Sequence, residues 1–167
     1  MSFSLYDVSI PVFIRNLKVL EQLLQKAQAH AAGNDASLVE SRLVADMKPL
    51  PFQVQVTCNT AKFQAVRVGG VKDVPVEDNE KTLPELLQRV AATITFLEAV
   101  KPDSMDGKED KEIKTMVRKG VEAPLNGKEY TFEFAIPNFF FHLGMTYALL
   151  RKEGVDVGKK DWLGNDL

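Results

Sequence analysis

The 167-residue chain has few of the residues that cross-link a fold or hold a metal: one cysteine and two histidines. A single thiol, Cys58, cannot form an intramolecular disulfide, and it excludes metal sites built from cysteine pairs. No apolar run reaches the roughly 18 residues that a membrane-spanning helix needs. The opening MSFSLYDVSI also lacks the basic and continuously apolar regions of a secretion signal. We therefore expect a cytoplasmic protein with no membrane partner.

Concentrated positive charge is missing as well. The formal net charge is −2, and the lysines and arginines are spread along the chain. Binding to a phosphate backbone requires basic residues gathered on one surface, so we predict no nucleic-acid partner. The 45% of apolar and 26% of charged residues are ordinary for a folded protein. At this length we expect one domain, residues 1–167.

The first helical segment is expected over residues 4–32, where apolar residues recur at helical spacing. Ser4 and Asp7 can cap its start, because a side-chain oxygen accepts the unpaired backbone N–H groups there. Pro11 then has two interpretations. Either it kinks this helix, or the regular helix begins near Ser9 with Pro11 in its first turn.

Three further helices follow from the same spacing. The second is expected over residues 51–68, and the third begins at Thr82-Leu-Pro-Glu85, a sequence typical of a capping box. The last is expected over residues 131–153, with Pro137 kinking or delaying it. The pattern predicts an all-α four-helix bundle with a long loop or small hairpin between the third and fourth helices.

That excursion is predicted from residues 101–130, where the helical pattern stops. KPDSMDGKEDKE is too polar to pack in a core, and Ile113, Thr115 and Val117 then alternate with charged or long residues. Asn126-Gly127 is a dipeptide that favours a type I′ hairpin turn.

The last helix carries two apolar stripes, whereas a helix in a lone four-helix bundle needs only one. The first contains Phe134, Asn138, Phe141, His142, Met145 and Leu149, and the second contains Ile136, Phe140, Leu143, Tyr147 and Leu150. A second subunit, the hairpin, or the C-terminal tail with Trp162 could cover the second stripe. We favour a homodimer, since an exposed stripe of this kind is an association site.

Asn138 and His142 are the polar members of the first stripe, four residues apart. Side chains at this spacing converge, so together they could hold a ligand or a metal ion. The simpler alternative is that both are core polar groups, bonded to the backbone, to water or to each other.

The stretch from Pro137 to Gly164, PNFFFHLGMTYALLRKEGVDVGKKDWLG, resembles the end of an uncharacterised domain-of-unknown-function family grouped with the DinB/YfiT-like helix bundles. SLYDVSIPVFIRNL and MKPLPFQVQ are similar to the same family. DinB-like proteins resemble metalloproteins whose site takes one histidine from the second helix and an H-x-x-x-H pair from the fourth. Some members are thiol-dependent transferases or hydrolases.

Carried over to this chain, the resemblance places Asn138 at the first histidine of the pair and His142 at the second. The second-helix position falls near Gln53 or Gln55, with Gln55 favoured. The three-histidine site is therefore incomplete, and two amides with one imidazole suit zinc or nickel poorly. We predict no metal and no cofactor. Amides that both donate and accept hydrogen bonds suit an organic ligand better.

Three functions remain open. The first, which we favour, is a DinB-like bundle without a metal that binds a small organic molecule in a pocket of Gln55, Asn138 and His142. The second is a metal-assisted thiol transferase or hydrolase that uses His142. The third is a structural or interaction protein.

Overall fold

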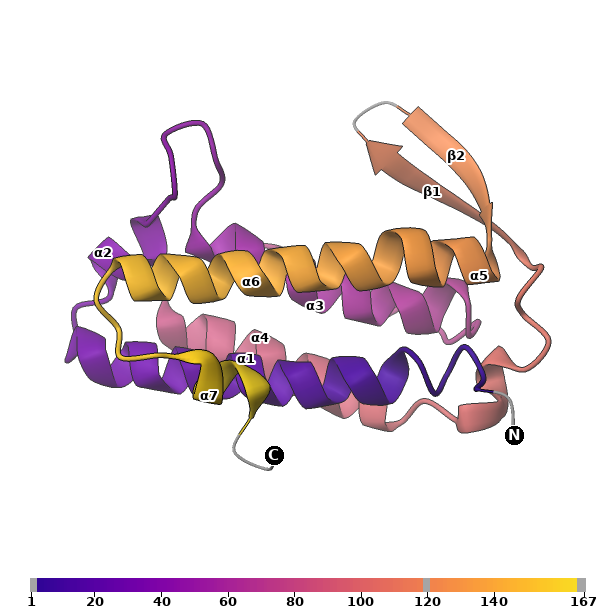
Figure 1. Cartoon of the computed structure of the whole chain (residues 1–167), viewed down its shortest axis with the longest axis horizontal. Coiled ribbons are helices and arrows are strands. Elements are labelled where there is room, and N and C mark those ends of the chain that lie inside the picture. The colour runs from indigo at the N-terminus through magenta and orange to yellow at the C-terminus, as the bar shows by residue number, and fades with distance from the viewer. Residues whose placement is uncertain (1–2, 119–120, 165–167) are drawn as a thin grey trace.

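The computed structural model describes residues 3–118 and 121–164, without the side chains of residues 116–123. The elements in order are α1 (Ile10–Ala31), α2 (Ala36–Glu40), α3 (Leu50–Arg67), α4 (Leu83–Glu98), the 3₁₀ turn η1 (Pro102–Met105), β1 (Glu112–Arg118), β2 (Val121–Asn126), α5 (Gly127–Glu129), the π-helical segment η2 (Tyr130–Ala135), α6 (Ile136–Lys152) and α7 (Lys159–Leu163). The four long helices α1, α3, α4 and α6 form the predicted bundle (Figure 1).

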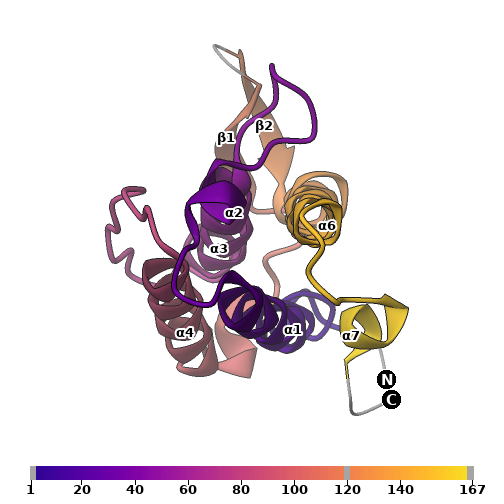
Figure 2. The same ribbon diagram turned by 90° about the vertical axis from the view of Figure 1, so that its left-hand side faces the viewer.

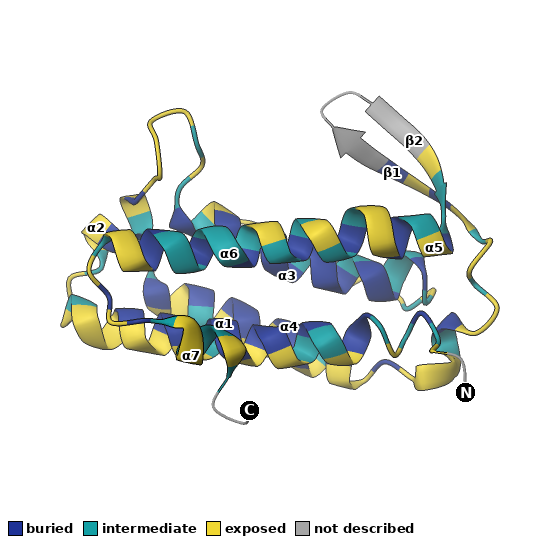
Figure 3. Cartoon of the chain, viewed as in Figure 1, coloured by how far each residue is buried: buried dark blue, intermediate teal, exposed yellow. Residues whose placement is uncertain are grey.

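The bundle is seen end-on in Figure 2. α3 lies between α4 and α6, α1 closes the other side, and α7 packs outside α1. The buried residues turn toward the space between the helices, as Figure 3 shows. At its centre the rings of Phe13 and Phe139 stack with centroids 4.5 Å apart, and neither is exposed to solvent. None of the described helices is long and apolar enough to cross a membrane.

Helix starts follow the local signals, with one correction. Thr82 and Glu85 form the predicted capping box, in which the Glu85 carboxylate accepts the Thr82 N–H at 3.0 Å. Ser4 and Asp7 also bond reciprocally, but they close a turn that precedes α1. The expected helix start at Ser4 is therefore wrong. α1 begins at Ile10 with Pro11 in its first turn, as the second interpretation predicted.

The predicted hairpin is present, but its turn is not at Asn126-Gly127. β1 and β2 are antiparallel with Glu112 opposite Asn126, so this dipeptide lies at the base of the hairpin, and the turn expected there is wrong. Asn126 instead caps α5, accepting the Glu129 N–H at 2.8 Å. Gly127 is required for packing, because a Cβ there would lie 2.0 Å from the carbonyl oxygen of Lys108.

α5, η2 and α6 follow one another without a break, and Pro137 lies in the first turn of α6. Proline cannot donate a backbone hydrogen bond, and the wider π turns precede it. Pro137 therefore delays the regular α-helix, as expected. The most deeply buried residues of α6 include Phe139 and Leu143. Phe139 belongs to neither predicted stripe, and the buried face lies between the two.

The C-terminal tail covers part of the second stripe. The rings of Tyr147 and Trp162 meet edge to face with centroids 5.9 Å apart. Trp162 also lies over Gly144, where an added Cβ would be 3.8 Å from its ring. The Lys26 ammonium pairs with Asp161 at 2.7 Å, which ties α7 to α1. Of the three covers considered for this stripe, the structure shows the tail.

Candidate functional site

Two polar pairs join α6 to α3. His142 Nδ1 lies 2.7 Å from Gln53 Oε1, and the Asn138 amide donates to Thr60 Oγ1 at 2.8 Å. Asn138 and His142 are one turn apart on α6, while their partners are two turns apart on α3. Each pair therefore lies on a single helix face, and both α6 side chains are half-buried.

The hydrogen bonds of Gln53 assign the tautomer of His142. Gln53 Nε2 donates to the backbone carbonyl of Lys48 at 2.9 Å, so its oxygen must face the imidazole. Nδ1 of His142 then carries the proton and donates, which leaves the lone pair on Nε2. Burial lowers the pKa of His142 to about 4, so the ring is neutral at pH 7.

A hollow of about 180 Å³ opens beside Asn138, between α3, η2 and β1. Its charged group is Arg67, which donates through one nitrogen to Thr115 Oγ1 at 2.7 Å and to the Tyr130 hydroxyl at 3.1 Å. The guanidinium carbon lies 4.5 Å from the ring centre of Phe63 and 5.6 Å from that of Tyr130. This half-buried cation thus lies within cation–π distance of two aromatic rings.

The partners of Arg67 are neutral. Among the described side chains, none of the ion pairs involves Arg67. Tyr130 stays a phenol, because burial raises its pKa although the Arg67 charge acts against this. A guanidinium with neutral hydroxyl partners still has N–H groups available for an anion. A carboxylate matches the planar fork of those donors.

Gln55 lies on another side of α3. Its amide nitrogen donates to Glu80 Oε2 at 3.0 Å, next to α4. The structure thus brings Asn138 and His142 to the same α3–α6 face, with Gln53 and not Gln55 as the α3 residue that meets the imidazole. Cys58 is also away from this face, and burial raises its thiol pKa to about 12.

The sequence reasoning missed Thr60 and Arg67, although a signal for them exists. Gln53, Thr60 and Arg67 follow one another at seven-residue spacing, so they form a polar row along α3. A search for polar heptads, in addition to apolar ones, would have found the row. It would not have found Tyr130 or Thr115, which come from distant segments.

The model of a family described as a domain of unknown function (DUF1993) matches residues 5–163 of the chain. The chain belongs to this family. Among solved structures, it is similar to the crystal structure of a DinB family member protein from Shewanella denitrificans, with 38% sequence identity and a TM-score of 0.88. That match covers 96% of this chain and 92% of the other. No curated protein matches.

In this DUF1993 protein, the residues at the positions carried over from the DinB-like metal site do not fit a metal ion. Only His142 offers an imidazole. The Gln53 oxygen is engaged with that ring, and the Asn138 amide donates to Thr60. Among the side chains that the structure describes, those of residues 3–115 and 124–164, no three His, Cys, Asp or Glu gather as a metal site would require. Neutral amides are poor ligands for zinc or nickel, so the donor set supports no metal-assisted step here.

Proposed function

We propose that this protein binds a small organic molecule carrying a carboxylate, in the hollow beside Arg67 and Asn138, and that it does so without a metal ion. The observation that carries the proposal is the half-buried Arg67, which lies against two aromatic rings and bonds only to hydroxyl groups among the described side chains. A partly desolvated cation gains from an anionic partner, and a ligand carboxylate would supply that partner.

The rest of the hollow suits an organic body. Phe63 and Phe134 line it with aromatic surface, while Thr60 and Asn138 provide neutral polar atoms. Apolar walls with a few fixed polar groups are typical of small-molecule sites. His142 lies one helical turn beyond Asn138 and is not among the residues that line the hollow, and neither is Gln55.

Benzoate and benzamide are matched probes for this proposal, because they share a shape and differ in charge. We expect benzoate to shift the backbone amide NMR signals of Thr60, Arg67 and Asn138 in a saturable titration, and benzamide to leave them in place. Arg67→Gln should abolish the benzoate response. Arg151→Gln is the control, since that side chain is 58% exposed. Equal responses to both probes, or an unchanged response in Arg67→Gln, would contradict the proposal.

An activity that uses His142 is the second candidate, and the oriented Nε2 lone pair is the observation that favours it. A pKa of about 4 makes this imidazole a weak base at pH 7, and the amides beside it are poor metal ligands, so we rank this candidate second. Elemental analysis of protein purified without a chelator or metal-binding tag tests it. Stoichiometric zinc or nickel, lost in His142→Ala, would favour a metal-assisted thiol transferase or hydrolase. Metal-free protein would count against that activity.

We also propose that the protein forms a homodimer. This proposal belongs to the third function, that of a structural or interaction protein. Trp162 covers Tyr147, so the exposed aromatic side chains of the last helical run are Phe132 and Phe141, at 47% and 56%. Aromatic side chains are enriched at association sites relative to the rest of a protein surface. Light scattering should give twice the mass of the chain, and Phe141→Glu should return a monomer. A wild-type monomer at every concentration would refute the dimer.

A further inference from the structure

A second cavity lies on another side of α3, toward α4, and Asn59 lines both this cavity and the hollow beside Arg67. It measures about 130 Å³ and is a partly open space between α3, α4 and the segment that connects them. Its lining includes the buried Cys58 of α3, together with the half-buried Phe96 and the exposed Ala92 of α4. Val74 and Val76 cover it from the connecting segment, residues 70–81, which we call the strap.

Side chains hold the strap in place, because it has no helix or strand of its own. Near its start, the Lys62 ammonium pairs with Asp73 at 2.9 Å and donates to the Val74 carbonyl at 3.1 Å. Among the described residues, no backbone–backbone hydrogen bond is made by residues 72–81. The strap therefore depends on contacts at its two ends.

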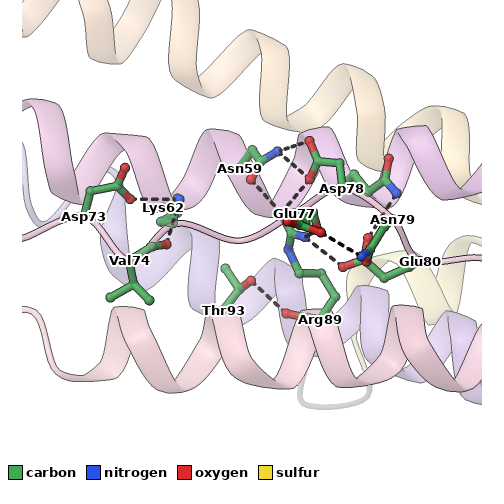
Figure 4. Close-up of polar contacts among 11 residues, drawn as sticks. Asn59, Lys62, Asp73, Val74, Glu77, Asp78, Asn79, Glu80, Arg89 and Thr93 are labelled. Atoms are coloured by element: carbon green, nitrogen blue, oxygen red, sulfur yellow. Dashed lines mark hydrogen bonds and ion pairs between the residues drawn. The ribbon is translucent and has the colours of Figure 1, made fainter.

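The contact at the other end is made by Arg89, whose polar contacts with the strap are drawn in Figure 4. Its side chain is only 4% exposed. It pairs with Glu80 at 2.8 Å and Asp78 at 2.9 Å, and it donates to the Glu77 carbonyl at 3.0 Å. Asn59 of α3 accepts a further bond from Arg89 at 2.7 Å. Val76 lies between these two attachments, and the Val74 carbonyl belongs to the first of them, so both attachments limit how far this part of the strap moves outward.

The groups around the cavity favour an uncharged occupant. Both cations beside it, Lys62 and Arg89, already have carboxylate partners. The Thr93 hydroxyl donates to the Arg89 carbonyl. The Cys58 thiol is neutral at pH 7, since burial raises its pKa to about 12. A charged molecule entering here would lose its hydration and find no free partner.

We infer that this cavity is a binding site for a small, neutral, apolar molecule of about the size of benzene, and that the strap is the lid through which it enters. An apolar cavity of about 150 Å³ engineered in another protein stays dry and binds benzene, so a volume of this order is sufficient. Val74 and Val76 are 54% and 47% exposed, and an occupant would give their inner surfaces an apolar contact.

Benzene is the probe for the full-length chain, with anilinium and benzoate as charged analogues. We expect benzene to raise the melting temperature and to shift the amide signals of Cys58, Val76 and Thr93 to saturation. Cys58→Met, which fills the cavity from α3, should weaken benzene binding about tenfold or more. Val76→Phe fills it from the strap and gives the same test if Cys58→Met does not fold.

The rate at which benzene exchanges between the cavity and solvent tests whether the strap is a lid. Asp78→Asn removes one of the two carboxylates from Arg89 and should speed benzene exchange several-fold, with affinity little changed. Arg67→Gln is the matched control, because it alters the other face of α3 and should leave benzene binding as in the wild type. Unchanged affinity in both filling variants, or signals that move elsewhere in the bundle, would overturn the site. Unchanged exchange in Asp78→Asn would overturn the lid.

Discussion

On two sides of α3 an arginine lies beside a hollow, but the two arginines have different hydrogen-bond and charge partners. Toward α4, Arg89 lies against two carboxylates, a backbone carbonyl and an amide oxygen. Toward α6, Arg67 meets two hydroxyl groups and two aromatic rings. In the first arrangement the protein itself supplies the anionic partners of the arginine. The second leaves room for an anion that the described side chains do not supply.

This difference shows how the same residue type can stabilise a fold or bind a ligand. A guanidinium surrounded by acids belongs to the structure, because removing it leaves negative charges facing one another. A guanidinium among hydroxyls can be removed at small cost, because hydroxyl groups can rotate to bond water or each other. Stability measurements should therefore separate the two faces before any ligand is known.

The largest effect is expected from Arg89→Met. The variant would leave Glu80, whose side chain is only 10% exposed, without its cation, and Asp78 beside it. We expect the free energy of unfolding in urea to fall by about 3 kcal/mol. Lys18→Met is the control, because its pair with Glu98 is about half exposed on both sides and should contribute less than about 1 kcal/mol. Equal losses in the two variants would contradict the structural role assigned to Arg89.

A pH dependence should come from the α6 side. Burial places the folded-state pKa of His142 at about 4, below its ordinary 6.5. The unfolded chain therefore binds more protons between these values, and stability falls as the pH drops through that window. We expect the free energy of unfolding to fall by about 2 kcal/mol between pH 7 and pH 4. This is less than the full pKa shift of His142 implies, because the ring is partly solvated.

His142→Gln should flatten this part of the urea-stability profile. His30→Gln serves as the control for losing one imidazole. If both variants keep the wild-type slope between pH 6.5 and pH 4, the neutral, oriented imidazole described for His142 is incorrect.

The smallest effect is expected from Arg67→Met. It removes two hydrogen bonds to hydroxyls, yet it retains apolar contact with Phe63 and Tyr130, so the cost should be about 1 kcal/mol. Benzoate binding should be lost in the same variant. A loss of stability as large as that of Arg89→Met would mean that Arg67 is a structural cation. The proposed ligand site would then lose its main support.

The helix boundaries were largely predictable because their signals are local. The Thr82–Glu85 capping box and the position of Pro11 depend on residues within one turn of each other. Asn126-Gly127 was misread because the same dipeptide suits a hairpin turn and a helix start. Only the close approach of Gly127 to the Lys108 backbone distinguishes the two.

The buried face of α6 could not be read from its two stripes. α3, α1 and α7 contact this helix from different directions, so the buried arc is wide and centred on Phe139, between the stripes. Asn138 and His142 then lie toward α3, while Tyr147 lies under the tail. A periodic pattern identifies an apolar arc, but it does not say which neighbour covers each part.

The sequence by itself determined the four long helices and the hairpin, since these follow from residue types and short spacings. The tertiary structure alone decided that Gln53 meets His142 while Gln55 meets Glu80. Residues two apart on an α-helix point about 200° away from each other. Which of them faces α6 depends on how the helices pack, and that is set by contacts between segments far apart in the chain.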